Sequence, residues 1–119
     1  MKKTLVLGAS ANPARYSCMA IKSLVSRGHS VEGVGLKEEE VSGIKIKKEQ
    51  FPFEDIDTIT LYLNPTRQQD YYDYIIELHP KRVIFNPGTE NPELYRLLRE
   101  KDIEVEVACT LVLLSVGQY

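Results

Sequence analysis

The sequence predicts an α/β fold, a doubly wound open parallel sheet of the Rossmann-like kind, and three observations support this. Short apolar runs alternate with helix-like segments, which requires a parallel sheet covered on both faces. The first apolar run stops at Gly8 and leads through a tight polar corner into a helical segment. A second corner rich in proline and glycine follows a later apolar run, at 86–89. We expect about five strands in the order 3-2-1-4-5.

Composition narrows the class of protein. The chain has 119 residues and a net charge of −2, and we expect a single domain over residues 1–119 without a nucleic-acid partner. The apolar run behind the N-terminal lysines is broken at Gly8, so it is neither an export signal nor a membrane span. The two cysteines, Cys18 and Cys109, lack a metal-binding spacing. These features indicate a reduced, cytoplasmic protein.

Local signals set the expected elements. Asn12 and Pro13 are typical of an N-cap and a first helical position, and Gly28 is typical of a helix end. Thr66 and Gln69 have the spacing of a capping box. We expect strands at 5–8, 30–36, 57–63, 82–85 and 104–107 and helices at 13–27, 66–78, 92–101 and 109–114. Between 37 and 56 we expect a small edge strand at 43–46 and a loop or single turn at 51–53.

In an open α/β sheet, ligands bind beyond the carboxyl ends of the strands, where the strand order reverses. The corner after the first strand directs unpaired N–H groups and the positive end of a helix dipole at one point, which favours a phosphate. Arg15 lies beside that point. An ordinary turn is the alternative interpretation of each corner. The strand ends in question are Gly8 to Asn12, Gly35 to Lys37, Asn64-Pro65 and Asn86 to Thr89.

The sequence favours some nucleotides over others. The first corner lacks the three-glycine dinucleotide fingerprint. The end of the second strand, Gly35-Leu36-Lys37, lacks the acidic residue that holds the ribose of NAD. Lys37 instead favours an additional phosphate on the ribose, as in NADP or coenzyme A, although a solvated lysine would look the same.

The residue pattern resembles a known family. The quoted segments are Val6-Leu7-Gly8-Ala9-Ser10 with Asn12-Pro13 and Arg15, residues 28–35, Ile56-Asp57 before a strand ending at Pro65, residues 85–88, and Cys109. In these the chain resembles, over nearly its whole length, the stand-alone CoA-binding domain proteins. These are small bacterial Rossmann-like proteins similar to the nucleotide-binding domain of the succinate–CoA ligase α subunit. Two loops depart from the family pattern, at 34–36 and at 85–88.

The resemblance implies a role for each corner. Arg15 and the first corner would meet the CoA phosphates, Lys37 would lie near the adenosine ribose, and Pro65 would line the adenine side. The loop 86–88 would face the pantetheine arm. The expected cofactor-binding residues are Gly8, Ala9, Ser10, Asn12, Pro13, Arg15, Gly35, Leu36, Lys37, Asn64, Pro65, Asn86, Pro87, Gly88 and Cys109.

We expect no catalytic residue. His29 and His79 lie at helix ends, where structural or solvent-facing roles are common, and Cys18 falls on a buried helix face. Cys109 is either a small buried hydrophobe or a thiol able to form a mixed disulfide with CoA.

Three functional hypotheses follow. The first is a non-catalytic CoA or acyl-CoA binding protein, as a sensor or carrier. The second is an NAD(P)-binding redox protein, and the third is an interaction module without a ligand. The apolar run at 109–114 also suggests a homodimer surface.

Overall fold

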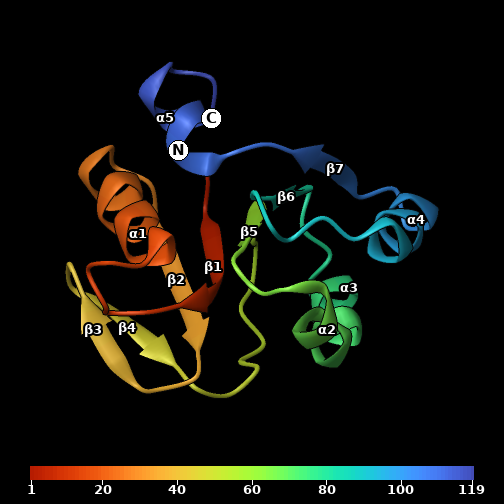
Figure 1. Cartoon of the computed structure of the whole chain (residues 1–119), viewed down its shortest axis with the longest axis horizontal. Coiled ribbons are helices and arrows are strands. Elements are labelled where there is room, and N and C mark those ends of the chain that lie inside the picture. The colour runs from red at the N-terminus through yellow and green to blue at the C-terminus, as the bar shows by residue number, and fades with distance from the viewer.

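The computed structural model describes residues 1–119 and has a mostly parallel sheet with helices on both faces (Figure 1). The strands are β1 (Thr4–Ala9), β2 (Val31–Gly35), β3 (Glu39–Val41), β4 (Ile44–Lys47), β5 (Thr58–Leu61), β6 (Arg82–Phe85) and β7 (Glu104–Val107). The helices are α1 (Tyr16–Ser26), α2 (Pro65–Gln68), the 3₁₀ turn η1 (Gln69–Tyr71), α3 (Tyr72–Leu78), α4 (Pro92–Glu100) and α5 (Thr110–Ser115).

The sheet has seven strands in the order β3-β4-β2-β1-β5-β6-β7, so the expected five strands in the order 3-2-1-4-5 were wrong. All neighbours are parallel except β3 and β4, which form an antiparallel hairpin. β4 takes the place beside β2, where the sequence predicted the strand at 57–63. That strand, β5, pairs with the other side of β1. The strand order therefore reverses between β1 and β5.

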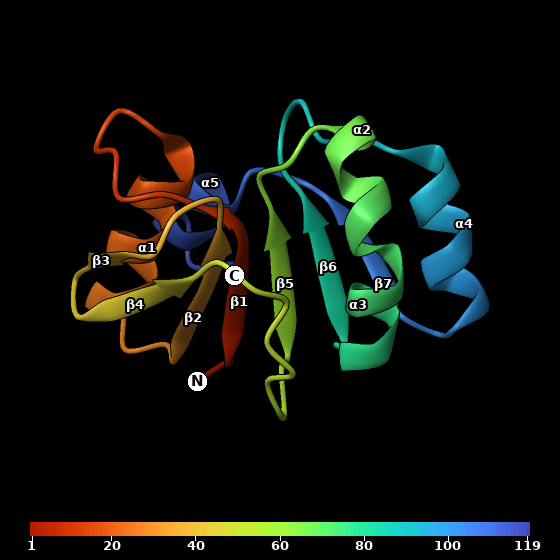
Figure 2. The ribbon, with the colours of Figure 1, turned by 90° about the horizontal axis from the view of Figure 1, so that it is seen from below.

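An apolar layer packs between the helices and each face of the sheet. α1 and α5 cover one face, and α2, α3 and α4 cover the other (Figure 2). Alternation along β1 divides its side chains, because Val6 packs under α1 while Leu5 and Leu7 pack toward α3 and α4. Cys18 is 1% exposed in the α1 layer, which confirms its predicted burial. None of the helices combines the length and apolar character needed to cross a membrane.

α1 begins at Tyr16, so the prediction that Asn12 caps a helix from 13 onward was wrong. The Asn12 side chain accepts a hydrogen bond from the N–H of Ala14 (3.0 Å), and its carbonyl accepts one from Arg15 (2.9 Å). These bonds close a turn that delays the helix. The end of α1 is as predicted, since Gly28 follows its last turn with φ +85°.

Of the N-caps predicted for the other helices, one was wrong and one was correct. Asn64 caps α2 by accepting a hydrogen bond from the N–H of Arg67 (2.9 Å), so the predicted capping box at Thr66 was wrong. Asn91 caps α4 as predicted, through the N–H of Leu94 (3.3 Å). A proline occupies the first turn of both helices.

Candidate ligand-binding cleft

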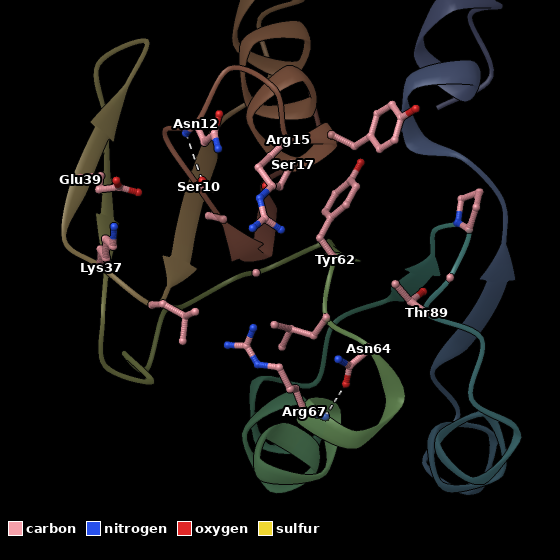
Figure 3. A pocket seen from close by; sticks show the side chains of 17 residues that line it. Ser10, Asn12, Arg15, Ser17, Lys37, Glu39, Tyr62, Asn64, Arg67 and Thr89 are labelled. Atoms are coloured by element: carbon pink, nitrogen blue, oxygen red, sulfur yellow. Dashed lines mark hydrogen bonds between the residues drawn. The ribbon is translucent and has the colours of Figure 1, made fainter.

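A cleft of about 550 Å³ opens at the carboxyl ends of β1, β2, β5 and β6, beside the point where the strand order reverses (Figure 3). This is where the doubly wound topology places ligands. The cleft is lined by Gly8, Ala9, Ser10, Asn12, Arg15, Tyr16, Ser17, Leu36, Lys37, Glu39, Tyr62, Leu63, Asn64, Arg67, Pro87, Gly88 and Thr89.

Two backbone amides of the first corner already donate hydrogen bonds to side-chain oxygens of the protein. The N–H of Ala11 donates to the carboxylate of Glu39 (3.1 Å), and the N–H of Asn12 donates to the hydroxyl of Ser10 (3.0 Å). The first bond ties the corner to the β3–β4 hairpin. These two amides are therefore already satisfied and fix the shape of the corner.

Other amides of the same corner remain free. The backbone N–H groups of Ser10, Tyr16 and Ser17 have no hydrogen-bond acceptor, and α1 has no side-chain cap. All three residues line the cleft. The positive end of the α1 dipole lies at the same place, and the Arg15 side chain adds a full charge. This arrangement suits a bound anion.

The charged side chains of the cleft are mainly cationic. The guanidinium groups of Arg15 and Arg67 enter the cavity from opposite walls, and Lys37 lies nearer the hairpin (Figure 3). None of these three side chains forms an ion pair. Glu39 is the one carboxylate among the lining residues. The cleft thus has an uncompensated positive charge.

The position of Arg67 is set by a rigid segment. Its own N–H is held by the Asn64 cap, and the next residue, Gln68, is fully buried. The Gln68 amide donates to the carbonyls of Leu63 (2.8 Å) and Thr89 (2.8 Å). Arg67 therefore extends into the cleft from backbone that is fixed on both sides.

Tyr62, which lines the cleft, and Asn86, which lies below it, differ in how their polar atoms are hydrogen-bonded. The Tyr62 hydroxyl is buried without a hydrogen-bond partner, and burial raises the pKa of this phenol to about 12. Asn86 is 2% exposed, and both its amide nitrogen and its amide oxygen form hydrogen bonds. Its amide donates to the Leu61 carbonyl (2.8 Å) and the Thr60 hydroxyl (2.7 Å), and its oxygen accepts from the N–H of Thr110 (2.9 Å). Asn86 thus joins β5, β6 and α5 instead of reaching the cleft.

Most residues expected at the site lie together. The cleft is lined by the expected Gly8, Ala9, Ser10, Asn12, Arg15, Leu36, Lys37, Asn64, Pro87 and Gly88.

Five expected residues do not line the cleft. Pro13 is exposed in the turn before α1, and Pro65 is exposed at the start of α2. Gly35 packs directly against the end of β1, where a Cβ would overlap the Ala9 carbonyl oxygen. Asn86 is bonded below the cleft, and Cys109 precedes α5 as its N-cap.

Sequence reasoning missed several lining residues for definable reasons. Tyr16 and Ser17 enter because α1 starts late, and Tyr62 and Leu63 enter because β5 ends at Leu61. Glu39 enters through the β3–β4 hairpin, whose first strand was not expected. The missed residues are Tyr16, Ser17, Glu39, Tyr62, Leu63 and Arg67, whereas Thr89 ends the expected corner 86–89 and lines the cleft with it.

The lining residues include no histidine or cysteine. His29 lies two residues before β2, at the opposite end of the strands, where its Nδ1 accepts a hydrogen bond from the N–H of Lys2 (3.1 Å). His79 ends α3 with φ +47° and is exposed. The side chains of the cleft are therefore suited to holding an anion and offer no imidazole or thiol for proton transfer or nucleophilic attack.

Comparison with solved structures gives matches over most or all of the chain. One, described as an uncharacterized protein, is 51% identical with a TM-score of 0.97 and covers 100% of this chain and 98% of its own. A hypothetical protein from Pyrococcus horikoshii is 30% identical with a TM-score of 0.82 and covers 93% of this chain and 80% of its own.

A larger enzyme shares the fold. The dinucleotide forming acetyl-coenzyme A synthetase of Ca. Korarchaeum cryptofilum, solved in complex with phosphate and ADP, is 18% identical with a TM-score of 0.71. The match covers 87% of this chain and 25% of the synthetase.

Sequence comparison identifies the family. No functionally curated protein matches the chain. The sequence profile of the CoA binding domain family matches residues 2–115, nearly the whole length. On this match the chain belongs to the CoA binding domain family.

Proposed function

We propose that this protein binds coenzyme A or an acyl-CoA in the cleft without catalysing a reaction, as a sensor or carrier. The observation that carries the proposal is the uncapped start of α1, where the free N–H groups of Ser10, Tyr16 and Ser17 lie beside Arg15. Hydrogen bonds from such groups to phosphate oxygens are charge-assisted and strong. The family match supports CoA as the source of the phosphates.

The remainder of the cleft supports the same ligand. Lys37 would meet the phosphorylated adenosine ribose, and Leu36 beside it exposes 64% of its surface as an apolar support for the base. On the other side, Pro87 and Gly88 would border the pantetheine arm.

Glu39 favours a second candidate, an NAD(P)-binding redox protein. Dinucleotide folds hold the ribose hydroxyls with an acidic side chain after the second strand. The sequence shows no such residue at the end of β2, but the hairpin brings the Glu39 carboxylate into the cleft. Lys37 lies in the same part of the cleft and would meet a ribose phosphate.

Binding measurements with a panel of nucleotides test the proposal. Thermal shift and calorimetry with CoA, acetyl-CoA, NAD, NADP and ATP should show the tightest binding for the CoA compounds. Arg15→Ala should weaken CoA binding by about 10- to 100-fold, the effect of losing a charge-assisted contact. Arg27→Ala removes an exposed arginine outside the cleft and should leave the affinity unchanged.

Other results of this experiment would contradict the proposal. Saturable NADP binding without CoA binding would favour the redox protein. A wild-type chain that binds none of the five compounds at millimolar concentration would favour an interaction module without a ligand.

A further inference from the structure

Arg67 has no part in the proposed contacts, yet it faces the same cavity as Arg15 (Figure 3). The two arginines come from different halves of the fold, since Arg15 precedes α1 and Arg67 lies within α2. The strand order reverses between β1 and β5, the strands that lead to them. A ligand at this point would therefore have one guanidinium on each side.

Both guanidinium groups lack a counter-charge within the protein. No carboxylate pairs with Arg15 or Arg67, and neither side chain donates a hydrogen bond. By contrast, Arg82 pairs with Glu106 (2.9 Å) and Arg96 pairs with Glu100 (3.2 Å). Two cations facing one cavity repel each other, and an anion between them would turn that repulsion into attraction.

The Glu39 carboxylate does not neutralise either arginine by forming an ion pair with it. Glu39 lines the cleft, but its carboxylate accepts the N–H of Ala11 and pairs with neither arginine. The two arginines therefore remain available to an anion from solution.

The base of Arg67 is fixed before any ligand arrives. Its N–H is bonded to the Asn64 side chain, and the buried Gln68 that follows accepts a hydrogen bond from the Asn91 amide (2.9 Å). A guanidinium is a planar fork that can bind two oxygens of one phosphoryl group. Arg67 thus combines a fixed base with a head group suited to phosphate.

We propose that Arg67 is the second side of a diphosphate clamp. Arg15 and the free amides of the first corner bind one phosphoryl group, and Arg67 binds the group linked to it. The site would then select ligands with two linked phosphates over monophosphates. The identity of the ligand as a CoA compound rests on the proposed function, whereas the clamp applies to any diphosphate.

Calorimetry at low salt with CoA, ADP, AMP, inorganic pyrophosphate and inorganic phosphate tests the clamp. Arg67→Ala should weaken CoA, ADP and pyrophosphate binding by about tenfold or more, and AMP and phosphate binding by less than about threefold. Arg67→Lys should recover only part of the loss, because an ammonium lacks the fork. Arg67→Gln provides a second neutral variant that keeps a long polar side chain, and Arg27→Ala is the matched control.

The outcomes separate the clamp from the proposed function. CoA binding that is unchanged by both Arg67→Ala and Arg67→Gln would overturn the clamp and leave the function standing. Equal losses for ADP and AMP would also overturn it, because they would indicate a general charge effect. Pyrophosphate binding that needs Arg67 in a protein that ignores CoA would keep the clamp and overturn the function. Absence of binding to all five compounds would overturn both.

Discussion

The corners after β1 and β6 contain the same residue types but differ in what they do. Each has a glycine with a positive φ, Gly8 at +94° and Gly88 at +92°, and each has an Asn-Pro pair. At the second corner, Asn91 caps α4 directly. At the first, Asn12 closes a turn and α1 starts uncapped. The same Asn-Pro pair can therefore stabilise the start of a helix or leave the helix amides free for a ligand.

The polar side chains next to the two corners also differ in whether the protein satisfies their hydrogen bonds. Asn86, below the second corner, has all its amide atoms bonded to neighbouring elements. Tyr62, below the first corner, has a buried hydroxyl without a partner. The second corner is therefore satisfied by the protein itself, whereas the first keeps unpaired polar groups near the cleft.

Alanine substitutions at Gly8 and Gly88 should give the largest difference in stability between the two corners. A Cβ at Gly8 would lie 2.9 Å from the backbone carbon of Tyr62, whereas a Cβ at Gly88 meets nothing within 4 Å. Gly8→Ala adds overpacking to backbone strain and should lower the free energy of unfolding by about 3–5 kcal/mol. Gly88→Ala adds strain alone, about 1–2 kcal/mol. Urea unfolding measures both, and equal losses would show that crowding at Gly8 is unimportant.

Alanine at the two asparagines should show a smaller difference. Asn91→Ala removes a cap and also strands the buried Gln68, whose oxygen accepts from Asn91, so we expect a loss of about 2–4 kcal/mol. Asn12→Ala breaks one hydrogen bond in an exposed turn and should lower the free energy of unfolding by less than about 1 kcal/mol. Thermal unfolding of both variants checks this, and a loss at Asn12 as large as that at Asn91 would contradict the comparison.

Of these substitutions, Tyr62→Phe should have the smallest effect on the free energy of unfolding at neutral pH. Because its buried hydroxyl has no hydrogen bond to lose, Tyr62→Phe should not lower the free energy of unfolding at pH 7. Burial raises the pKa of Tyr62 to about 12, above its ordinary value of 10.0 in the unfolded chain. The unfolded chain loses this proton first, so the wild type should lose stability relative to Tyr62→Phe from about pH 10 to about pH 12.

That relative loss should reach about 2 kcal/mol. Urea unfolding of both chains at several pH values provides the measurement. Parallel pH profiles for the wild type and Tyr62→Phe would show that the phenol is not held neutral by burial.

Elements that depend on local signals were predicted well. β6 and β7 have the expected boundaries, and Asn91 caps α4 as expected. These features follow from short apolar runs and from a cap that bonds within its own turn. The corner at Asn12 has the same local signal and a different outcome, because its side chain bonds to the N–H of Ala14 instead of a helical amide.

The strand order could not be read from local signals. The edge beside β2 can accept only one parallel neighbour, and the β3–β4 hairpin occupies it. This outcome depends on competition between segments far apart in the chain. The same hairpin brings Glu39 to the cleft, although no acidic residue lies at the end of β2 in the sequence.

The sequence by itself determined the α/β class, the first corner with Arg15, and the resemblance that the family match confirmed. It could do so because periodicity and turn chemistry act between residues that are close in the chain. Only the tertiary structure decided which strand lies beside β2 and that Arg67 faces Arg15. Both depend on long-range packing, which brings together side chains whose separation in sequence holds no information about their distance in space.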